Sequence, residues 1–274
     1  MIDEPVQNIV NGNDVLRVIL FDWDDTLFPT TWLSNYEHLL DDPTMDKSYI
    51  SFIYQSLQKI EQNVYKLFEE ILNYCSIFYI ITNAESGWVE YTSSKYMPFV
   101  FNFILSNLDK IKIISARSNN SIQYPNCHYK WKLIEITNIL STIHNQSENY
   151  FSASRKHVIS FGDNTIEKEA TKEVTSVYPN IITKTIKFID TPTCDQLVEQ
   201  LEHVYTKLSY IINGAYSIDM LMDNFCTNLY NCQPQNDINK DIEKNEYYPS
   251  LEDLMNSFQQ RLDVIKNALD SLDQ

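Results

Sequence analysis

The chain of 274 residues is long enough to bury a substantial core, and its 43% hydrophobic and 21% charged residues are typical of a soluble globular protein. A formal net charge of -16 disfavours binding to nucleic acids or anionic membranes. No apolar run approaches the length that spans a membrane, no signal peptide follows the acidic N-terminus, and the five scattered cysteines form no Cys-x-x-Cys pair. We therefore expect a cytoplasmic protein with reduced thiols; a nuclear location is compatible with the same features.

The apolar segments along the chain predict a parallel sheet. Strands that are buried on both faces of such a sheet are continuous apolar runs rather than alternating ones. Five segments have this character, at about residues 16–22, 77–82, 111–115, 157–161 and 184–189. Helical stretches separate them, and the clearest covers about 50–74, where apolar residues recur at helical spacing. This alternation predicts an α/β fold with a Rossmann-like, doubly wound parallel sheet and right-handed crossovers.

The first predicted strand runs directly into a pair of acidic residues. The apolar run 16–21 is followed by Asp22-Trp23-Asp24-Asp25-Thr26, which places Asp22 and Asp24 at the carboxyl edge of the sheet. Open α/β sheets bind ligands at this edge. One carboxylate can act as a nucleophile, and the second can donate and recover a proton. An acidic turn that caps a helix is the alternative, but the preceding strand favours a functional site.

Two further candidates follow in the middle of the chain. The second predicted strand ends in Thr82, whose hydroxyl and backbone amide could hold a phosphate oxygen. Lys132 lies at the start of a predicted helix and could neutralise both a phosphoryl group and a nucleophilic aspartate. Lys130 is a competing candidate for this role. Taken singly, each of these residues is more often structural, so their evidence lies in their order along the chain.

The fourth predicted strand ends in a glycine that is followed by acidic residues. It runs into Gly162-Asp163, and Glu167 comes four residues after the aspartate. The chain has only four glycines, and a glycine here permits a tight turn and a close approach of the backbone to a ligand. Asp163 and Glu167 supply the hard oxygen ligands that Mg²⁺ prefers. For this motif alone, a Gly-Asp turn with a capping acid is the alternative.

Together, these features resemble the four motifs of the haloacid dehalogenase superfamily of phosphohydrolases. The matching motifs are Asp22-x-Asp24-x-Thr26, Thr82, Lys132 and Gly162-Asp163-x-x-x-Glu167, and the resemblance covers about residues 14 to 190. Smaller matches resemble a protist-type subgroup, namely Phe21–Leu27, Ile81–Glu85, Ile114–Arg117 and Trp131-Lys132. The resemblance implies the strand order 3-2-1-4-5, with the strand that ends in Asp22 at the centre.

The resemblance also implies a Mg²⁺-dependent phosphatase that acts on a phosphomonoester. Asp22 would form an aspartyl-phosphate, and Asp24 would protonate the leaving group and then activate water. Thr82 and Lys132 would hold the phosphoryl oxygens. The implied metal ligands are Asp22, the backbone carbonyl of Asp24 and Asp163. Glu167 would lie at or next to the metal, at a position where the family often has Asp. The alternatives are a phosphotransferase, a catalytically silent binding protein of the same fold, and a nucleic-acid end phosphatase, which the absence of a basic stripe disfavours.

The intervals between the motifs leave no room for a full cap domain over the site. Neither the stretch from Thr26 to Thr82 nor the stretch from Thr82 to Lys132 is long enough. We therefore expect a capless or minimally capped enzyme, whose phosphorylated substrate is a small molecule or, by analogy, a bulky phosphoprotein. For most of the aromatic residues near the motifs we expect core packing, with a substrate entrance as the alternative. These residues are Trp23, Phe28, Trp32 and Trp88.

Four regions follow from these patterns. Residues 1–192 form the predicted catalytic domain. Residues 193–230 predict a helical extension, with one helix from about Leu197 to Ile211 and a second from Ile218 to Leu229. Residues 231–248 have almost no apolar anchors, which predicts a flexible linker. Residues 249–274 predict an amphipathic helix that docks on the core; a homodimer or a partner groove is the alternative.

Overall fold

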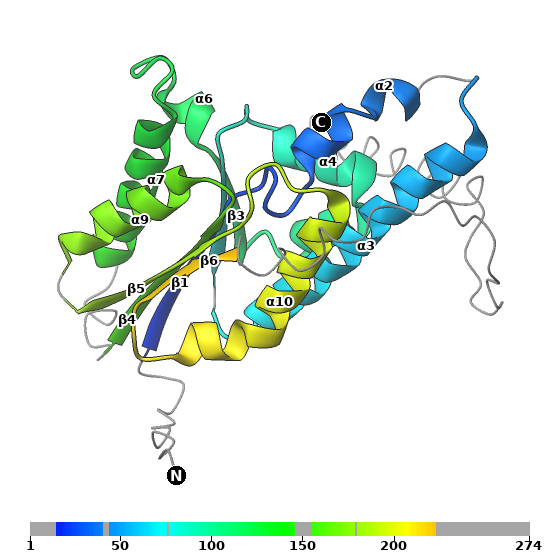
Figure 1. The fold of residues 1–274 in the computed structure, drawn as a ribbon. Coiled ribbons are helices and arrows are strands. Elements are labelled where there is room, and N and C mark those ends of the chain that lie inside the picture. The colour runs from blue at the N-terminus through cyan, green and yellow to red at the C-terminus, as the bar shows by residue number, and fades with distance from the viewer. Residues whose placement is uncertain (1–14, 41–43, 76, 146–154, 179, 223–274) are drawn as a thin grey trace, which may run out of the picture.

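The computed structural model describes residues 15–40, 44–75, 77–145, 155–178 and 180–222 (Figure 1). The linker expected at 231–248 and the amphipathic helix expected at 249–274, with its docking, dimer or partner role, lie outside these residues. Within the described part of the chain, no helix is both long enough and apolar enough to cross a membrane.

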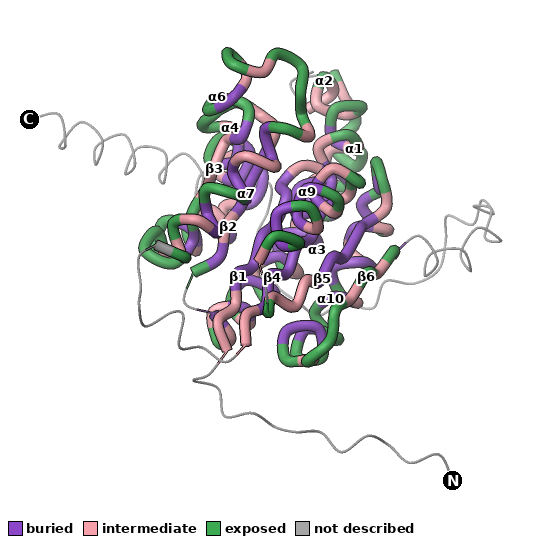
Figure 2. Tube along the Cα trace, turned by 90° about the vertical axis from the view of Figure 1, so that its left-hand side faces the viewer, coloured by how far each residue is buried: buried purple, intermediate pink, exposed green. Residues whose placement is uncertain are grey.

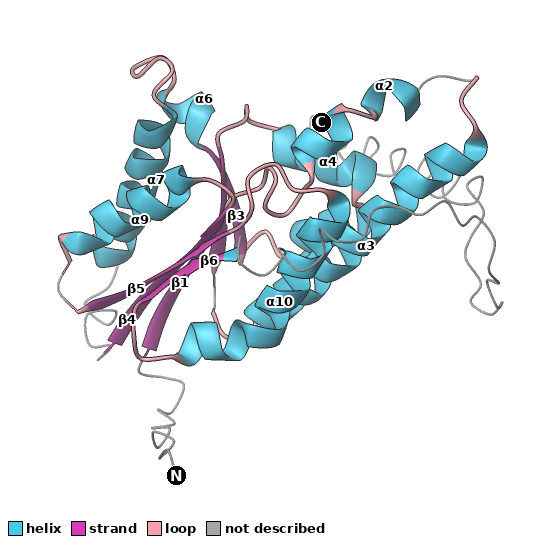
Figure 3. Ribbon diagram, viewed as in Figure 1, coloured by secondary structure: helices cyan, strands magenta, loops and turns pink. Residues whose placement is uncertain are grey.

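One sheet of six parallel strands forms the centre of the molecule (Figure 3). The strands are β1 (Val15–Phe21), β2 (Phe78–Thr82), β3 (Ile111–Ser115), β4 (Arg155–Gly162), β5 (Ile181–Lys187) and β6 (Ile218–Leu221). Their order across the sheet is β3-β2-β1-β4-β5-β6, so β1 lies between β2 and β4. The expected α/β class with a parallel sheet is confirmed, and β6 is an additional strand beside β5.

Helices cover both faces of the sheet, as the doubly wound arrangement requires (Figure 1). One face carries α3 (Lys47–Ile71), α4 (Trp88–Tyr96), α5 (Pro98–Ser106) and α10 (Cys194–Asn213). The opposite face carries α6 (Ala116–Asn120), α7 (His128–Asn145) and α9 (Thr165–Ser176). Two short helices, α1 (Thr30–Ser34) and α2 (Glu37–Leu40), follow the loop after β1.

The sheet separates two hydrophobic cores (Figure 2). Successive side chains of a strand point to opposite faces, so Ile19 and Phe21 enter one core while Val18 and Leu20 enter the other. Phe21 stacks on Phe161 of the neighbouring strand, with their ring centroids 4.6 Å apart. The second half of β1, residues 18–21, is apolar and buried on both faces, so packing on either side holds the end of the strand in one place.

The long helix expected near 50–74 is present as α3, and α10 is the first helix expected in the C-terminal extension. Both helices bury their apolar stripes in the same core cluster, against the same face of the sheet. The side chain of Thr193 accepts a hydrogen bond from the amide of Gln196 and completes a capping box at the start of α10. The residues of α10 therefore pack as part of the α/β core.

The second helix expected from Ile218 is wrong, because Ile218–Leu221 forms β6 and pairs with β5. Ile218 and Met220 are half-buried and pack against the core, whereas Asp219 points to the other side. There its carboxylate lies 2.8 Å from Lys168 Nζ and 2.7 Å from Lys172 Nζ of α9. Ile218 and Met220, which are two residues apart, therefore lie on the same face of a strand. The rest of that expected helix, from 223 onwards, lies outside the described residues.

Candidate active site

The strand register brings the ends of three motif-bearing strands to one edge of the sheet. Phe21 of β1 pairs with Ile80 of β2 on one side and with Phe161 of β4 on the other. The amide of Asp22 donates a hydrogen bond to the carbonyl oxygen of Phe161 at 2.9 Å, which continues the pairing past the end of β1. The residues that follow β1, β2 and β4 therefore lie next to one another, at the edge where parallel α/β sheets bind ligands.

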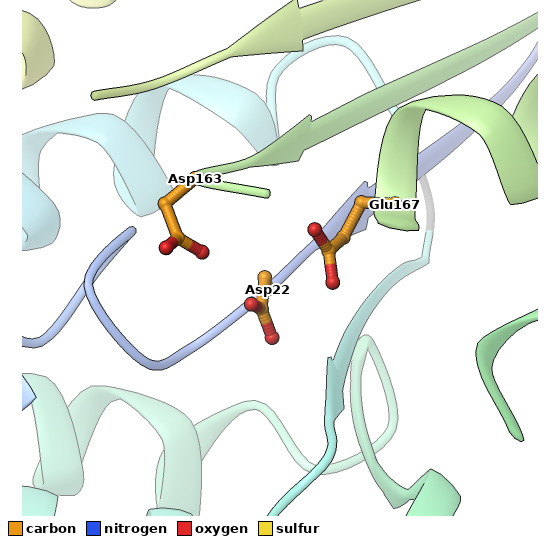
Figure 4. A group of neighbouring side chains, drawn as sticks. All are labelled: Asp22, Asp163 and Glu167. Atoms are coloured by element: carbon orange, nitrogen blue, oxygen red, sulfur yellow. The ribbon is translucent and has the colours of Figure 1, made fainter. Parts of the chain in front are cut away.

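Three carboxylates converge at this edge (Figure 4). Asp22 follows β1, Asp163 follows β4 and Glu167 lies in the first turn of α9. One carboxylate oxygen from each lies within 4.8 Å of the others. Asp22 and Glu167 are buried, and Asp163 is half-buried. Carboxylates gathered this closely repel one another unless a cation lies among them.

Gly162 is what allows Glu167 to approach the sheet so closely. A Cβ atom on this residue would lie 2.6 Å from Cγ and 2.8 Å from Cβ of Glu167, closer than such atoms can pack. The start of α9 is also fixed by Asn164, whose side chain accepts a hydrogen bond from the amide of Ile166 at 3.2 Å. The glycine at the end of β4 and the Asn164 cap of α9 together allow Glu167, four residues after Asp163, to lie against the end of the strand.

Lys132 reaches this acidic cluster from α7. Its Nζ lies 2.6 Å from Asp22 Oδ1 and 3.2 Å from Glu167 Oε1, and it also donates a hydrogen bond to the carbonyl oxygen of Ile81. Lys132 is only 1% exposed, so these contacts are shielded from water. Lys130 is exposed instead, and its Nζ lies 3.6 Å from the centroid of the Tyr124 ring. Of the two lysines, it is Lys132 that contacts Asp22.

Burial and mutual repulsion perturb the pKa values of this cluster. Burial raises the pKa of Asp22 well above its usual range, Lys132 lowers it, and the charges of Glu167 and Asp163 raise it further. Burial and the charges of Glu167 and Asp25 likewise raise the pKa of Asp163 to about 7, against the effect of Lys132. Burial alone would lower the pKa of Lys132, but the neighbouring Asp22 and Glu167 outweigh it and raise that pKa. The cluster therefore favours bound cations, whether protons or a metal.

The carboxylate of Asp24 is held by three hydrogen-bond donors that do not belong to the acidic cluster. Its Oδ2 accepts a hydrogen bond from the Thr82 hydroxyl at 2.9 Å. Its Oδ1 accepts one from the Thr30 hydroxyl at 2.6 Å and one from the indole nitrogen of Trp88 at 2.8 Å. The Thr82 hydroxyl is itself oriented by the amide of Ala84, which donates to it at 2.9 Å. Thr82 thus lies beside Asp24, and the metal role implied for Asp24 concerns its backbone carbonyl.

The loop after β1 has a compact, strained turn. Asp25 has a φ of 53°, in the left-handed region that a non-glycine residue rarely adopts. Its buried carboxylate accepts hydrogen bonds from the amide and the hydroxyl of Thr31, at 2.9 and 2.5 Å. These bonds tie the start of α1 to the turn that carries Asp24. The buried rings of Trp23 and Phe28 stack on each other, with centroids 5.9 Å apart, so the side chain of Trp23 packs in the core although its backbone lies between the two aspartates.

The sequence patterns single out the three carboxylates that the structure brings together, and Thr82, but they do not predict the other two donors to Asp24. No motif includes Thr30, and for Trp88 the sequence predicts only a place in the core or at a substrate entrance. Five residues of loop lie between Asp24 and Thr30, and Trp88 belongs to another element, α4. No local spacing rule predicts either contact, because both depend on the turn at Asp25.

The donor set fits a hard divalent cation. Oxygen-only carboxylate ligands suit Mg²⁺, and Asp22, Asp163 and Glu167 provide them from separate elements. Glu167 Oε2 is buried and has no hydrogen-bond partner among the residues that the structure describes. An unsatisfied buried carboxylate oxygen is costly, and a metal ligand role accounts for it.

Comparisons with protein-family models, with curated proteins and with solved structures each find no match. The resemblance to the haloacid dehalogenase superfamily therefore stays a prediction from the motifs.

Proposed function

We propose that this protein is a Mg²⁺-dependent phosphatase of the haloacid dehalogenase type, which hydrolyses a phosphomonoester through an aspartyl-phosphate. The observation that carries the proposal is the contact of Lys132 with both Asp22 and Glu167, in a cluster that Asp163 completes. Three of the four motifs thus meet within one small volume. A helix-capping turn or an isolated surface acid has no need of such a buried arrangement.

Asp22 is the proposed nucleophile. Its Oδ1 is bonded to Lys132, whose charge offsets the repulsion between the carboxylate and an incoming phosphoryl group. Asp24 is the proposed acid and base, two residues further along the turn. Thr82 lies within hydrogen-bonding distance of Asp24 and can turn its hydroxyl to a phosphoryl oxygen.

Asp22, Asp163 and Glu167 are the residues that would hold Mg²⁺, together with the backbone carbonyl of Asp24. When bound, the ion supplies positive charge that stabilises the phosphoryl transition state and offsets repulsion between nucleophile and substrate. The unsatisfied Oε2 of Glu167 supports a place for Glu167 at or next to the ion.

The surroundings of the site support a substrate larger than a small metabolite. In the described residues between Thr26 and Thr82, α1 and α2 are short helices and α3 belongs to the core. Between Thr82 and Lys132 the chain forms α4, α5, β3 and α6, which also pack on the sheet. Among the described residues, neither interval forms a separate cap domain, and a site without such a domain can admit the side chain of a phosphoprotein. The step to a protein substrate is an analogy.

The test is hydrolysis of p-nitrophenyl phosphate with Mg²⁺ and with EDTA. Asp22→Asn keeps the shape of the residue and removes the nucleophile, so we expect turnover to fall by roughly three or more orders of magnitude. Asp109→Asn, a substitution at an exposed aspartate away from the motifs, is the matched control and should leave turnover unchanged.

Turnover that needs Mg²⁺ and disappears in Asp22→Asn would support the proposal. Near-normal turnover in Asp22→Asn would remove Asp22 from its role. A wild-type protein that binds Mg²⁺ but hydrolyses neither this ester nor a panel of phosphopeptides would point to a binding protein.

A further inference from the structure

The two oxygens of Asp24 have different surroundings. Oδ1 accepts hydrogen bonds from Thr30 at 2.6 Å and Trp88 at 2.8 Å, whereas Oδ2 accepts one from Thr82 at 2.9 Å. A carboxylate oxygen has about two lone-pair directions, so the two donors on Oδ1 occupy both of them. Oδ2 keeps one direction open, on the side of the hydroxyl that we assign to phosphoryl binding.

The donors on Oδ1 come from elements that do not contribute to the metal cluster. Thr30 is the first residue of α1, and Trp88 is the first residue of α4. Both are half-buried, and the loop that carries Thr30 is fixed by the bonds between Asp25 and Thr31. The carboxylate is therefore clamped from one side by two separate parts of the chain.

We infer that Trp88 and Thr30 are positioning residues that hold Oδ1 of Asp24, so that Oδ2 is the atom that transfers the proton. The inference rests on the proposed phosphatase function. It adds which oxygen of Asp24 transfers the proton and which two residues determine this. A proton on Oδ1 would have to replace one of two well-formed hydrogen bonds. A proton on Oδ2 takes the open direction of that oxygen and displaces neither of the bonds to Oδ1.

The proton balance of the reaction follows from this arrangement. As Asp22 forms its bond to phosphorus, the bond from phosphorus to the leaving oxygen breaks, and the proton on Asp24 Oδ2 passes to that oxygen. Water then attacks the aspartyl-phosphate and gives a proton back to Oδ2. The bond between phosphorus and Asp22 breaks, and inorganic phosphate and the Asp22 carboxylate are released.

The test uses the dependence of turnover on the leaving group. Phenoxide is a stronger base than p-nitrophenoxide, so phenyl phosphate needs the proton from Asp24 more than p-nitrophenyl phosphate does. In Trp88→Phe we expect kcat on phenyl phosphate to fall roughly 10- to 100-fold, the effect of one hydrogen bond to a charged group. The loss on p-nitrophenyl phosphate should be clearly smaller, and the melting temperature and Mg²⁺ affinity should change little.

Matched variants separate this role from a general loss of packing. Thr30→Val removes the second donor and should show the same leaving-group dependence, whereas Thr30→Ser keeps the hydroxyl and should restore turnover. Trp32→Phe alters another partly buried tryptophan, whose ring packs against Tyr36 with centroids 4.7 Å apart, and should leave the ratio of the two rates unchanged.

Each outcome decides the question. A larger loss on phenyl phosphate in both Trp88→Phe and Thr30→Val supports the inference. Equal losses on both esters, or no loss on either, overturn the inference. The phosphatase proposal still stands in that case if the wild type hydrolyses the esters and Asp22→Asn does not. A wild type without turnover on either ester overturns both.

Discussion

Removing the ammonium group of Lys132 should destabilise the metal-free protein more than any substitution of an exposed lysine. Methionine has a similar length and no charge, so Lys132→Met mainly deletes the contacts with Asp22, Glu167 and the carbonyl of Ile81. Two buried carboxylates then lack their cation. Breaking a buried ion pair in this way costs about 3–5 kcal/mol of unfolding free energy. The burial of Lys132, at 1% exposure, places it in this class.

The loss should depend on pH in a definite direction. Lys132 lowers the pKa of Asp22, which burial raises, so its removal raises that pKa further. A carboxyl group whose pKa is raised on folding stabilises the folded state at low pH and loses this contribution as pH rises through the folded-state pKa. The destabilisation by Lys132→Met should therefore be larger near pH 8 than near pH 5, by up to about 4 kcal/mol for one proton.

Urea unfolding in EDTA, followed by tryptophan fluorescence at several pH values, measures this free energy. Lys130→Met is the matched control, because its exposed ammonium lies over the Tyr124 ring, and we expect a change within about 1 kcal/mol. In the double variant Lys132→Met with Asp22→Asn, part of the lost stability should return. Equal midpoints for Lys132→Met and Lys130→Met would refute the buried contacts on which this reasoning depends.

Three further predictions concern the metal site and the core. Gly162→Ala places a methyl group against Glu167, so it should cost about 1–3 kcal/mol in urea unfolding and weaken Mg²⁺ binding measured by calorimetry. Because the pKa of Asp163 is raised to about 7, Mg²⁺ binding should release a proton and weaken below that pH, which calorimetry in buffers of different ionisation enthalpy detects. Glu61→Ala removes a buried acceptor of two amides at the start of α5, so thermal unfolding should show a loss of about 1–3 kcal/mol, unlike the exposed Glu69→Ala.

Each of these predictions has a result that would contradict it. Unchanged Mg²⁺ affinity in Gly162→Ala would mean that Glu167 is not needed near the ion. Binding without proton release near neutral pH would contradict the raised pKa of Asp163. Equal stability of the Glu61 and Glu69 variants would mean that the amides at the start of α5 find other partners.

The central strands of the sheet can be predicted from the apolar pattern of the sequence, but the edge strand β6 cannot. Strands buried on both faces leave mostly apolar segments that the sequence shows directly, such as residues 18–21 of β1 and 158–161 of β4. β6 is only four residues long, and over that length apolar positions fit a helix or a strand equally well. Pairing with β5 and the contact of Asp219 with two lysines of α9 fix this segment as a strand, and these partners are remote in the sequence.

The candidate site divides in the same way. The carboxylates lie directly after strands, so their positions follow from the strand ends, as Asp22 and Asp163 illustrate. Lys132 and Lys130 are two residues apart, about half a turn of α7, so their side chains lie on different sides of the helix. Lys132 therefore reaches the buried acidic cluster, whereas Lys130 lies at the surface. Sequence alone left this choice open, because it depends on which face of the helix meets the sheet. The partners of Asp24 depend on a turn with positive φ at Asp25, which no pattern of residue types reveals.

In the proposed phosphatase, the charge at the carboxyl edge would link Mg²⁺ binding to substrate binding. Asp22, Asp163 and Glu167 carry three negative charges when ionised, and Lys132 offsets one of them. In the metal-free protein, burial raises the pKa values of Asp22 and Asp163, and this excess of negative charge raises them further. A divalent cation would neutralise the remainder, and only then would a phosphate ester, itself an anion, approach Asp22 without strong repulsion. Substrate affinity should therefore depend on Mg²⁺ more steeply than folding does. A protein of net charge -16 needs such a local centre of positive charge to bind an anionic substrate at all.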